Sequence, residues 1–103
     1  MSEAEQLFHE LATTLPNATE SRMFGAMCIK APNGKAAAMF WKGDMVFKTD
    51  KTTEPDLLSL DGAHVFSPAE GKKMGGWIVV PFHYKYHWKT FTQSSLQLAT
   101  SAK

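Results

Sequence analysis

The chain has 103 residues, 44% of them hydrophobic and 12% aromatic, and its formal net charge is +1. This length fits one domain that buries about 65% of the surface of its unfolded chain, and the apolar content excludes a disordered protein. The charge is close to zero and no basic run exceeds two residues, so we expect no nucleic-acid partner.

The cell compartment follows from what the sequence lacks. The start of the chain is acidic and amphipathic, unlike a secretory leader, and no stretch approaches the roughly 20 apolar residues of a membrane span. The single Cys28 has no partner for an internal disulfide, which suits a reducing compartment. We expect a cytoplasmic protein with no membrane contact.

The first predicted element is an amphipathic helix. One apolar stripe repeats at helical spacing, with Ser2 and Glu5 placed as a capping box at its start and Pro16 at its end. The stripe consists of Ala4, Leu7, Phe8, Leu11, Ala12 and Leu15.

Three strands follow in an antiparallel meander. We predict strands over 23–30, 35–41 and 45–49, joined by turns at Asn33-Gly34 and at Lys42-Gly43-Asp44. The first of these strands is apolar on both alternating faces, which is typical of a strand that is covered on both sides or lies at an interface.

The second half of the chain adds a short helix, two strands and a last helix. Thr53 and Pro55 predict a helix start, 63–66 and 77–80 predict strands separated by a long loop over 67–76, and a helix begins near Lys85. The predicted fold class is therefore α+β: a two-layer α/β sandwich in the order α-βββ-α-ββ-α, with a largely antiparallel five-stranded sheet. We expect a single domain over residues 1–103, with its core at about 3–100.

The histidines were the first candidates for chemistry. His83 and His87 stand four apart, the spacing of the zinc-binding face of a metalloprotease helix, but Pro81 sets a boundary that leaves His83 outside the helix. We therefore favour an aromatic junction between strand and helix over a metal site. Glu70-Gly71-Lys72-Lys73 lacks the spacing of a phosphate-binding loop, and Cys28 lies in an apolar strand without a neighbouring histidine. We predict no catalytic residue, no metal, no cofactor and no enzymatic activity.

The apolar meander suggests an interface instead. Met27, Met39 and Trp41 belong to strands that look apolar on both faces, and such a surface fits a second subunit. We expect a homodimer, and an unidentified protein partner is a further candidate.

Several short motifs together carry a family resemblance. In order they are Arg22-Met23-Phe24-Gly25, Asn33-Gly34-Lys35, Phe47-Lys48, and Lys73-Met74-Gly75-Gly76-Trp77 leading to Val80-Pro81, followed by Trp88. Over about residues 5–100 the chain resembles the TfoX N-terminal domain-like family of small bacterial proteins. The resemblance implies a secretion-chaperone-like α/β fold and a bacterial, cytoplasmic protein. In the family's namesake, a regulator of natural competence, this domain precedes a second, helical domain that is not in these 103 residues.

The motifs also suggest a cationic cluster. Arg22, Lys48 and Lys73 stand at the ends of predicted strands, and together they could hold a carboxylate or phosphate group near the 71–76 loop. The alternative, which we favour, is a structural salt bridge from Arg22 to Glu20, Asp44 or Asp50. The leading functional hypothesis is thus a non-enzymatic, regulatory protein-interaction module, and the second is a domain that binds a small anionic ligand.

Overall fold

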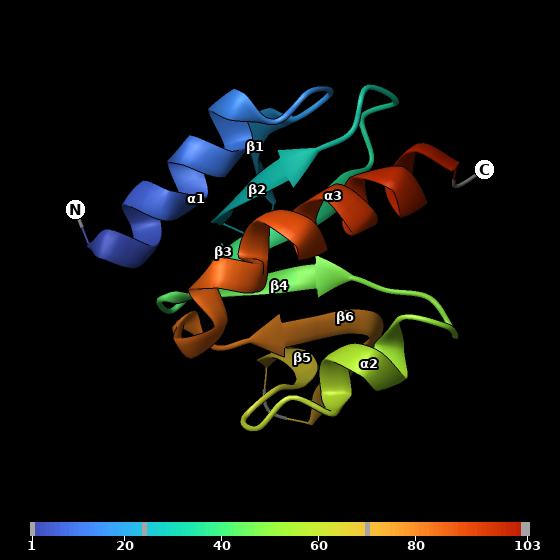
Figure 1. Ribbon diagram of the computed structural model, residues 1–103. Helices are drawn as coiled ribbons and strands as arrows, with labels where there is room; N and C mark the ends of the chain where they lie inside the picture. The colour runs from blue at the N-terminus through green and yellow to red at the C-terminus, as the bar shows by residue number, and fades with distance from the viewer. Residues whose placement is uncertain (1, 24, 70, 102–103) are drawn as a thin grey trace.

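A six-stranded antiparallel sheet, with helices packed on one of its faces, forms the body of the protein (Figure 1). The computed structural model describes residues 2–23, 25–69 and 71–101. The strands lie in the order β1-β2-β3-β4-β6-β5, and every neighbouring pair is antiparallel. The α+β class is confirmed, but the sheet has one strand more than the five predicted.

The first helix, α1 (Glu3–Thr14), begins as its sequence predicts. The Ser2 hydroxyl accepts a hydrogen bond of 3.1 Å from the backbone N–H of Glu5, which satisfies one of the free donors at the helix start. Its buried side chains are Ala4, Phe8, Leu11 and Ala12, all members of the predicted stripe.

The predicted strand over 23–30 is wrong, because the chain reverses within it. Strands β1 (Thr19–Met23) and β2 (Ala26–Lys30) form a hairpin in which Met23 lies opposite Ala26. Gly25 has a positive φ of 76°, a conformation that glycine adopts without steric cost. Phe24, part of the family motif, lies outside the described residues.

The hairpin that turns at Lys42 and Gly43 matches its prediction closely. Strands β3 (Ala36–Trp41) and β4 (Asp44–Lys48) pair with Trp41 opposite Asp44, which leaves a two-residue turn. Lys42 and Gly43 both have positive φ, 51° and 88°, as a type I′ turn requires.

The predicted loop over 67–76 is also wrong, because most of it is paired strand. Strand β5 (His64–Ala69) pairs with β6 (Lys72–Val80), and Ala69 lies opposite Lys72. The register shifts sharply, because Val65 faces Ile78 whereas the next residue, Phe66, faces Met74. Such a shift is a bulge that bends the hairpin.

The remaining helices are α2 (Glu54–Leu58), the 3₁₀ turn η1 (Phe82–Tyr84) and α3 (Lys85–Ser101). The start of α3 at Lys85 confirms the prediction, and it leaves His83 outside the α-helix. Before α2, Thr53 holds the predicted N-cap position but its side chain does not cap the helix. The Asp50 carboxylate instead accepts hydrogen bonds from the backbone N–H groups of Thr52 and Thr53.

The main core lies between the sheet and the helices. In Figure 1, α1 packs against β1 whereas α3 crosses β3 and β4. The largest buried members of this core are Phe8, Phe47, Ile78 and Trp88. No described helix has both the length and the apolar character that a membrane span needs.

A second apolar cluster occupies the opposite face of the sheet. Its buried members are Cys28, Met39, Val46, Phe66 and Val79, with Trp41, Met74 and Trp77 packed around them. The first three come from β2, β3 and β4, whereas Phe66 and Met74 come from the bent end of the β5–β6 hairpin. The outer part of this hairpin therefore folds over the second face and covers it.

Candidate functional site

An open hollow lies where α1, the β1–β2 hairpin and the β3–β4 turn meet. Its volume is about 430 Å³, and we call it the Arg22 hollow. The residues that line it are Glu5, Arg22, Gly25, Ala26, Met27, Phe40, Trp41 and Lys42.

The strand pairing explains how these residues come together. Arg22 lies directly opposite Met27, so both side chains project from the same face of the sheet. Met27 and Phe40 pack against the main core beneath the helices. The hollow therefore has an apolar floor of Met27 and Phe40, with Arg22 at its edge.

The side chain of Arg22 is exposed. Among the described residues, it forms neither an ion pair nor a hydrogen bond. The salt bridge from Arg22 to Glu20, Asp44 or Asp50 that we favoured from the sequence is therefore not formed. A charged, five-donor group beside apolar surface is left free to bind an anion.

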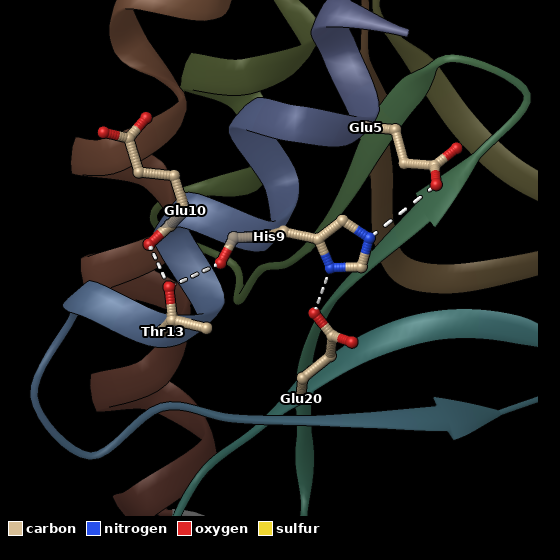
Figure 2. A network of polar contacts seen from close by, with 5 residues as sticks. All are labelled: Glu5, His9, Glu10, Thr13 and Glu20. Atoms are coloured by element: carbon tan, nitrogen blue, oxygen red, sulfur yellow. Dashed lines mark hydrogen bonds and ion pairs between the residues drawn. The ribbon is translucent and has the colours of Figure 1, made fainter. Parts of the chain in front are cut away.

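His9 explains why Glu20 does not pair with Arg22. Figure 2 shows the His9 ring between two carboxylates, with Nδ1 contacting Glu20 of β1 and Nε2 lying 3.7 Å from Glu5 of α1. The backbone carbonyl of His9 accepts a hydrogen bond of 2.9 Å from the Thr13 hydroxyl. The Glu5–His9–Glu20 network thus ties α1 to the edge strand and engages Glu20, so that Glu20 does not pair with Arg22.

Lys42 supplies the second positive charge of the hollow. Its ammonium lies 5.8 Å from the centre of the Trp41 ring, and among the described residues it has no carboxylate partner. The type I′ turn requires a positive φ at Lys42, although the Cβ of a lysine crowds the backbone there.

The structure does not bring the three predicted cations together. Lys42 precedes the first residue of β4, whereas Lys48 is the last residue of this strand. Lys48 pairs with Trp77, and its ammonium lies 5.4 Å from the centre of the Trp77 ring. Trp77 belongs to the second cluster, so Lys48 projects from the opposite face of the sheet to Arg22. Lys73 is exposed on the bent hairpin, between the residues that face Ala69 and Phe66.

The three residues predicted for an interface differ in how deeply they are buried. Met39 is fully buried in the second cluster and has no surface to offer a partner. Met27 and Trp41 are partly buried and both line the Arg22 hollow. The chain's own hairpin covers the apolar face that suggested a dimer, and the large hydrophobic side chains classed as exposed in the described part of the chain are Leu58 and Tyr86.

The other candidates for chemistry show structural contacts. The His83 ring contacts Tyr84 and the His87 ring contacts Phe91. Over residues 2–23, 25–69 and 71–101, no three His, Cys, Asp or Glu side chains are placed to hold a metal ion. Cys28 is fully buried, and this burial raises the pKa of its thiol, so it lacks the setting of a reactive cysteine.

Sequence reasoning missed Glu5, Phe40 and Lys42 as site residues. The turn at Lys42 matches its prediction, and this turn alone places Lys42 next to Trp41. What was missing was the reversal at Gly25, because it is this hairpin that brings Arg22 beside Met27. No family model, no curated protein and no solved structure matches the chain. The resemblance to the TfoX N-terminal domain-like family stays a prediction.

Proposed function

We propose that this protein is a non-enzymatic binding domain that takes up an anionic ligand in the Arg22 hollow. The observation that carries the proposal is the guanidinium of Arg22, which pairs with no described residue and lies at the edge of an apolar floor. The proposal keeps Arg22 from the cluster expected from the sequence and replaces Lys48 and Lys73 with Lys42.

Charge favours an anion in this place. Arg22 and Lys42 contribute two positive charges to the lining of the hollow, and Glu5 contributes one negative charge. A guanidinium can hold a carboxylate or phosphate through two parallel hydrogen bonds, and such charge-assisted bonds are about twice as strong as neutral ones.

The floor adds a requirement for apolar groups. Met27, Phe40 and Trp41 are all partly exposed and all line the hollow. Burying apolar ligand surface against them contributes about 25 cal/mol per Å². The preferred ligand therefore joins a carboxylate or phosphate to an aromatic or aliphatic group.

The test uses 3-phenylpropionate and phenyl phosphate as probes, with binding followed by calorimetry and by thermal shift. Arg22→Gln should weaken binding about tenfold or more, because losing a hydrogen bond to a charged group costs about 1.5–3 kcal/mol. Lys48→Gln and Lys73→Gln remove the same charge elsewhere on the surface and should bind like the wild type. Absence of binding, or equal loss in all three variants, would contradict the proposal.

A second candidate function is contact with a partner protein, and the free edge of β1 favours it. This strand ends the described sheet, so one side of its backbone lacks a neighbouring strand. If two copies paired antiparallel about Ser21, Glu20 of one copy would lie opposite Arg22 of the other. Sedimentation velocity across a wide concentration range tests this, and a monomer at every concentration would reject the homodimer that the sequence suggested.

A further inference from the structure

The lining of the Arg22 hollow contains opposite charges that do not neutralise each other. Glu5 comes from α1 and Arg22 from β1, and both line the hollow, yet no ion pair joins them. A ligand with a single negative charge would leave Glu5 with its 3.7 Å contact to His9 and with no contact to the ligand.

One oxygen of Glu5 is available. The contact with His9 uses Oε2 at 3.7 Å, and within the described residues Oε1 has no partner. The Glu5 side chain is about one-third exposed, so a ligand in the hollow can contact its carboxylate.

From this arrangement we infer that the ligand is a zwitterion: a free α-amino acid with an apolar side chain. Its carboxylate would bind Arg22, its ammonium would bind Glu5, and its side chain would lie on Met27 and Phe40. Lys42 adds attraction for the carboxylate. The inference rests on the proposed function, since it concerns the same hollow, and it adds the ammonium as a recognised group.

Three probes separate the parts of this inference. L-Phenylalanine carries both charges, 3-phenylpropionate lacks the ammonium, and 2-phenylethylamine lacks the carboxylate. We expect L-phenylalanine to bind about fivefold more tightly than 3-phenylpropionate, as one additional partly exposed ion pair allows. 2-Phenylethylamine should bind most weakly, because it cannot use Arg22.

The variant Glu5→Gln tests the role of the carboxylate. It should bind L-phenylalanine and 3-phenylpropionate about equally, because the ammonium loses its partner. It should bind 3-phenylpropionate at least as tightly as the wild type does, because a negative charge is removed from the lining. The matched control is Glu10→Gln, which removes a charge from the same helix outside the lining of the hollow and should keep the fivefold preference. Backbone amide shifts of Gly25, Met27 and Lys42 in NMR titrations would place the ligand, and circular dichroism would verify that both variants fold.

The outcomes are distinguishable. Equal binding of L-phenylalanine and 3-phenylpropionate to the wild type would overturn the zwitterion and leave the anionic site standing. A preference for L-phenylalanine that survives Glu5→Gln would overturn the assignment of Glu5. If none of the probes bound, this inference and the proposed function would fail together.

Discussion

The ring of Trp41 packs edge-on against the ring of Phe66, with 5.1 Å between their centres. Trp41 belongs to β3 and Phe66 to β5, and in the sheet β4 and β6 lie between these strands. A flat sheet would hold the two rings apart. They meet because the β5–β6 hairpin bends at its bulge and lies over the second face.

The bend depends on the backbone at Gly76. This glycine has a positive φ of 84°, and its carbonyl accepts a hydrogen bond of 2.7 Å from the Thr49 N–H. Gly76→Ala should lower the free energy of unfolding by about 1–2 kcal/mol, because alanine is strained at positive φ. Urea unfolding would measure the loss. Gly75→Ala is the control, since Gly75 lacks a positive φ and a Cβ there meets nothing within 4 Å. This substitution should change the free energy of unfolding by less than about 0.5 kcal/mol.

The thiol of Cys28 should be protected in the folded protein. It is fully buried, and desolvation is the main reason that its pKa is raised, with Lys30 lowering it less. Because the thiolate is the reactive form, a disulfide reagent at neutral pH should label the native protein slowly and the urea-unfolded protein completely. Fast stoichiometric labelling of native protein would contradict the cover that the β5–β6 hairpin gives the second face.

The carboxylate of Asp50 should make the free energy of unfolding depend on pH in the acidic range. Its pKa is lowered from 3.8, mainly by the hydrogen bond from the Thr53 N–H and further by those from Thr52 and the Thr53 hydroxyl. A folded-state pKa below the unfolded value means that this stabilisation is present above pH 3.8 and is lost as the pH falls through the folded-state pKa.

Asp50→Asn should therefore be less stable than the wild type at neutral pH, and the difference should shrink when the pH falls below about 3.8. Urea unfolding of both proteins across this range measures it. Asp61→Asn is the control, because the Asp61 carboxylate has no hydrogen bond to a described residue and its substitution should give no such pH-dependent difference. A constant difference at Asp50 would exclude the ionised carboxylate as its source.

Lys42 should show a conflict between stability and binding. Asparagine tolerates positive φ better than lysine and is favoured before glycine in a type I′ turn. Lys42→Asn should therefore raise the free energy of unfolding by about 0.5–1 kcal/mol while weakening 3-phenylpropionate binding. Lys51→Asn makes the same exchange at a residue without a positive φ and should change neither property. If Lys42→Asn gained stability and bound as well as the wild type, Lys42 would have no part in the site.

Regular local patterns made much of this fold predictable. The stripe of α1, the Asn33-Gly34 and Lys42-Gly43 turns and the start of α3 after Pro81 each follow from a short-range rule, and the structure has them where expected. The errors arose where a local pattern had two interpretations. The apolar run around Gly25 reads as one buried strand. The polar 67–76 segment reads as a loop, because Met74 is the single large apolar residue in its sequence.

The candidate site was predicted in part for a related reason. The sequence suggests Arg22 for an anion site and Met27 and Trp41 for an interface, and the structure places all three around one hollow. Predicting that required the pairing of β1 with β2, which follows from a single local reversal at Gly25. Lys48 and Lys73 were grouped with Arg22 on the assumption that their strand ends meet, and the bend of the β5–β6 hairpin and the direction of β4 prevent this.

The second cluster affects how the alignment of paired strands is specified, because it buries the second face of the sheet. In most half-exposed sheets, a slip of one residue would turn apolar side chains toward water, and that penalty fixes the alignment. Here, Cys28 and Ile29 are both buried, as are Ala38 and Met39, so a slip in the centre of the sheet exchanges one buried side chain for another. The glycine turns of the hairpins therefore carry much of the information that prevents such slippage, and errors in those turns would yield misaligned sheets rather than unfolded chains.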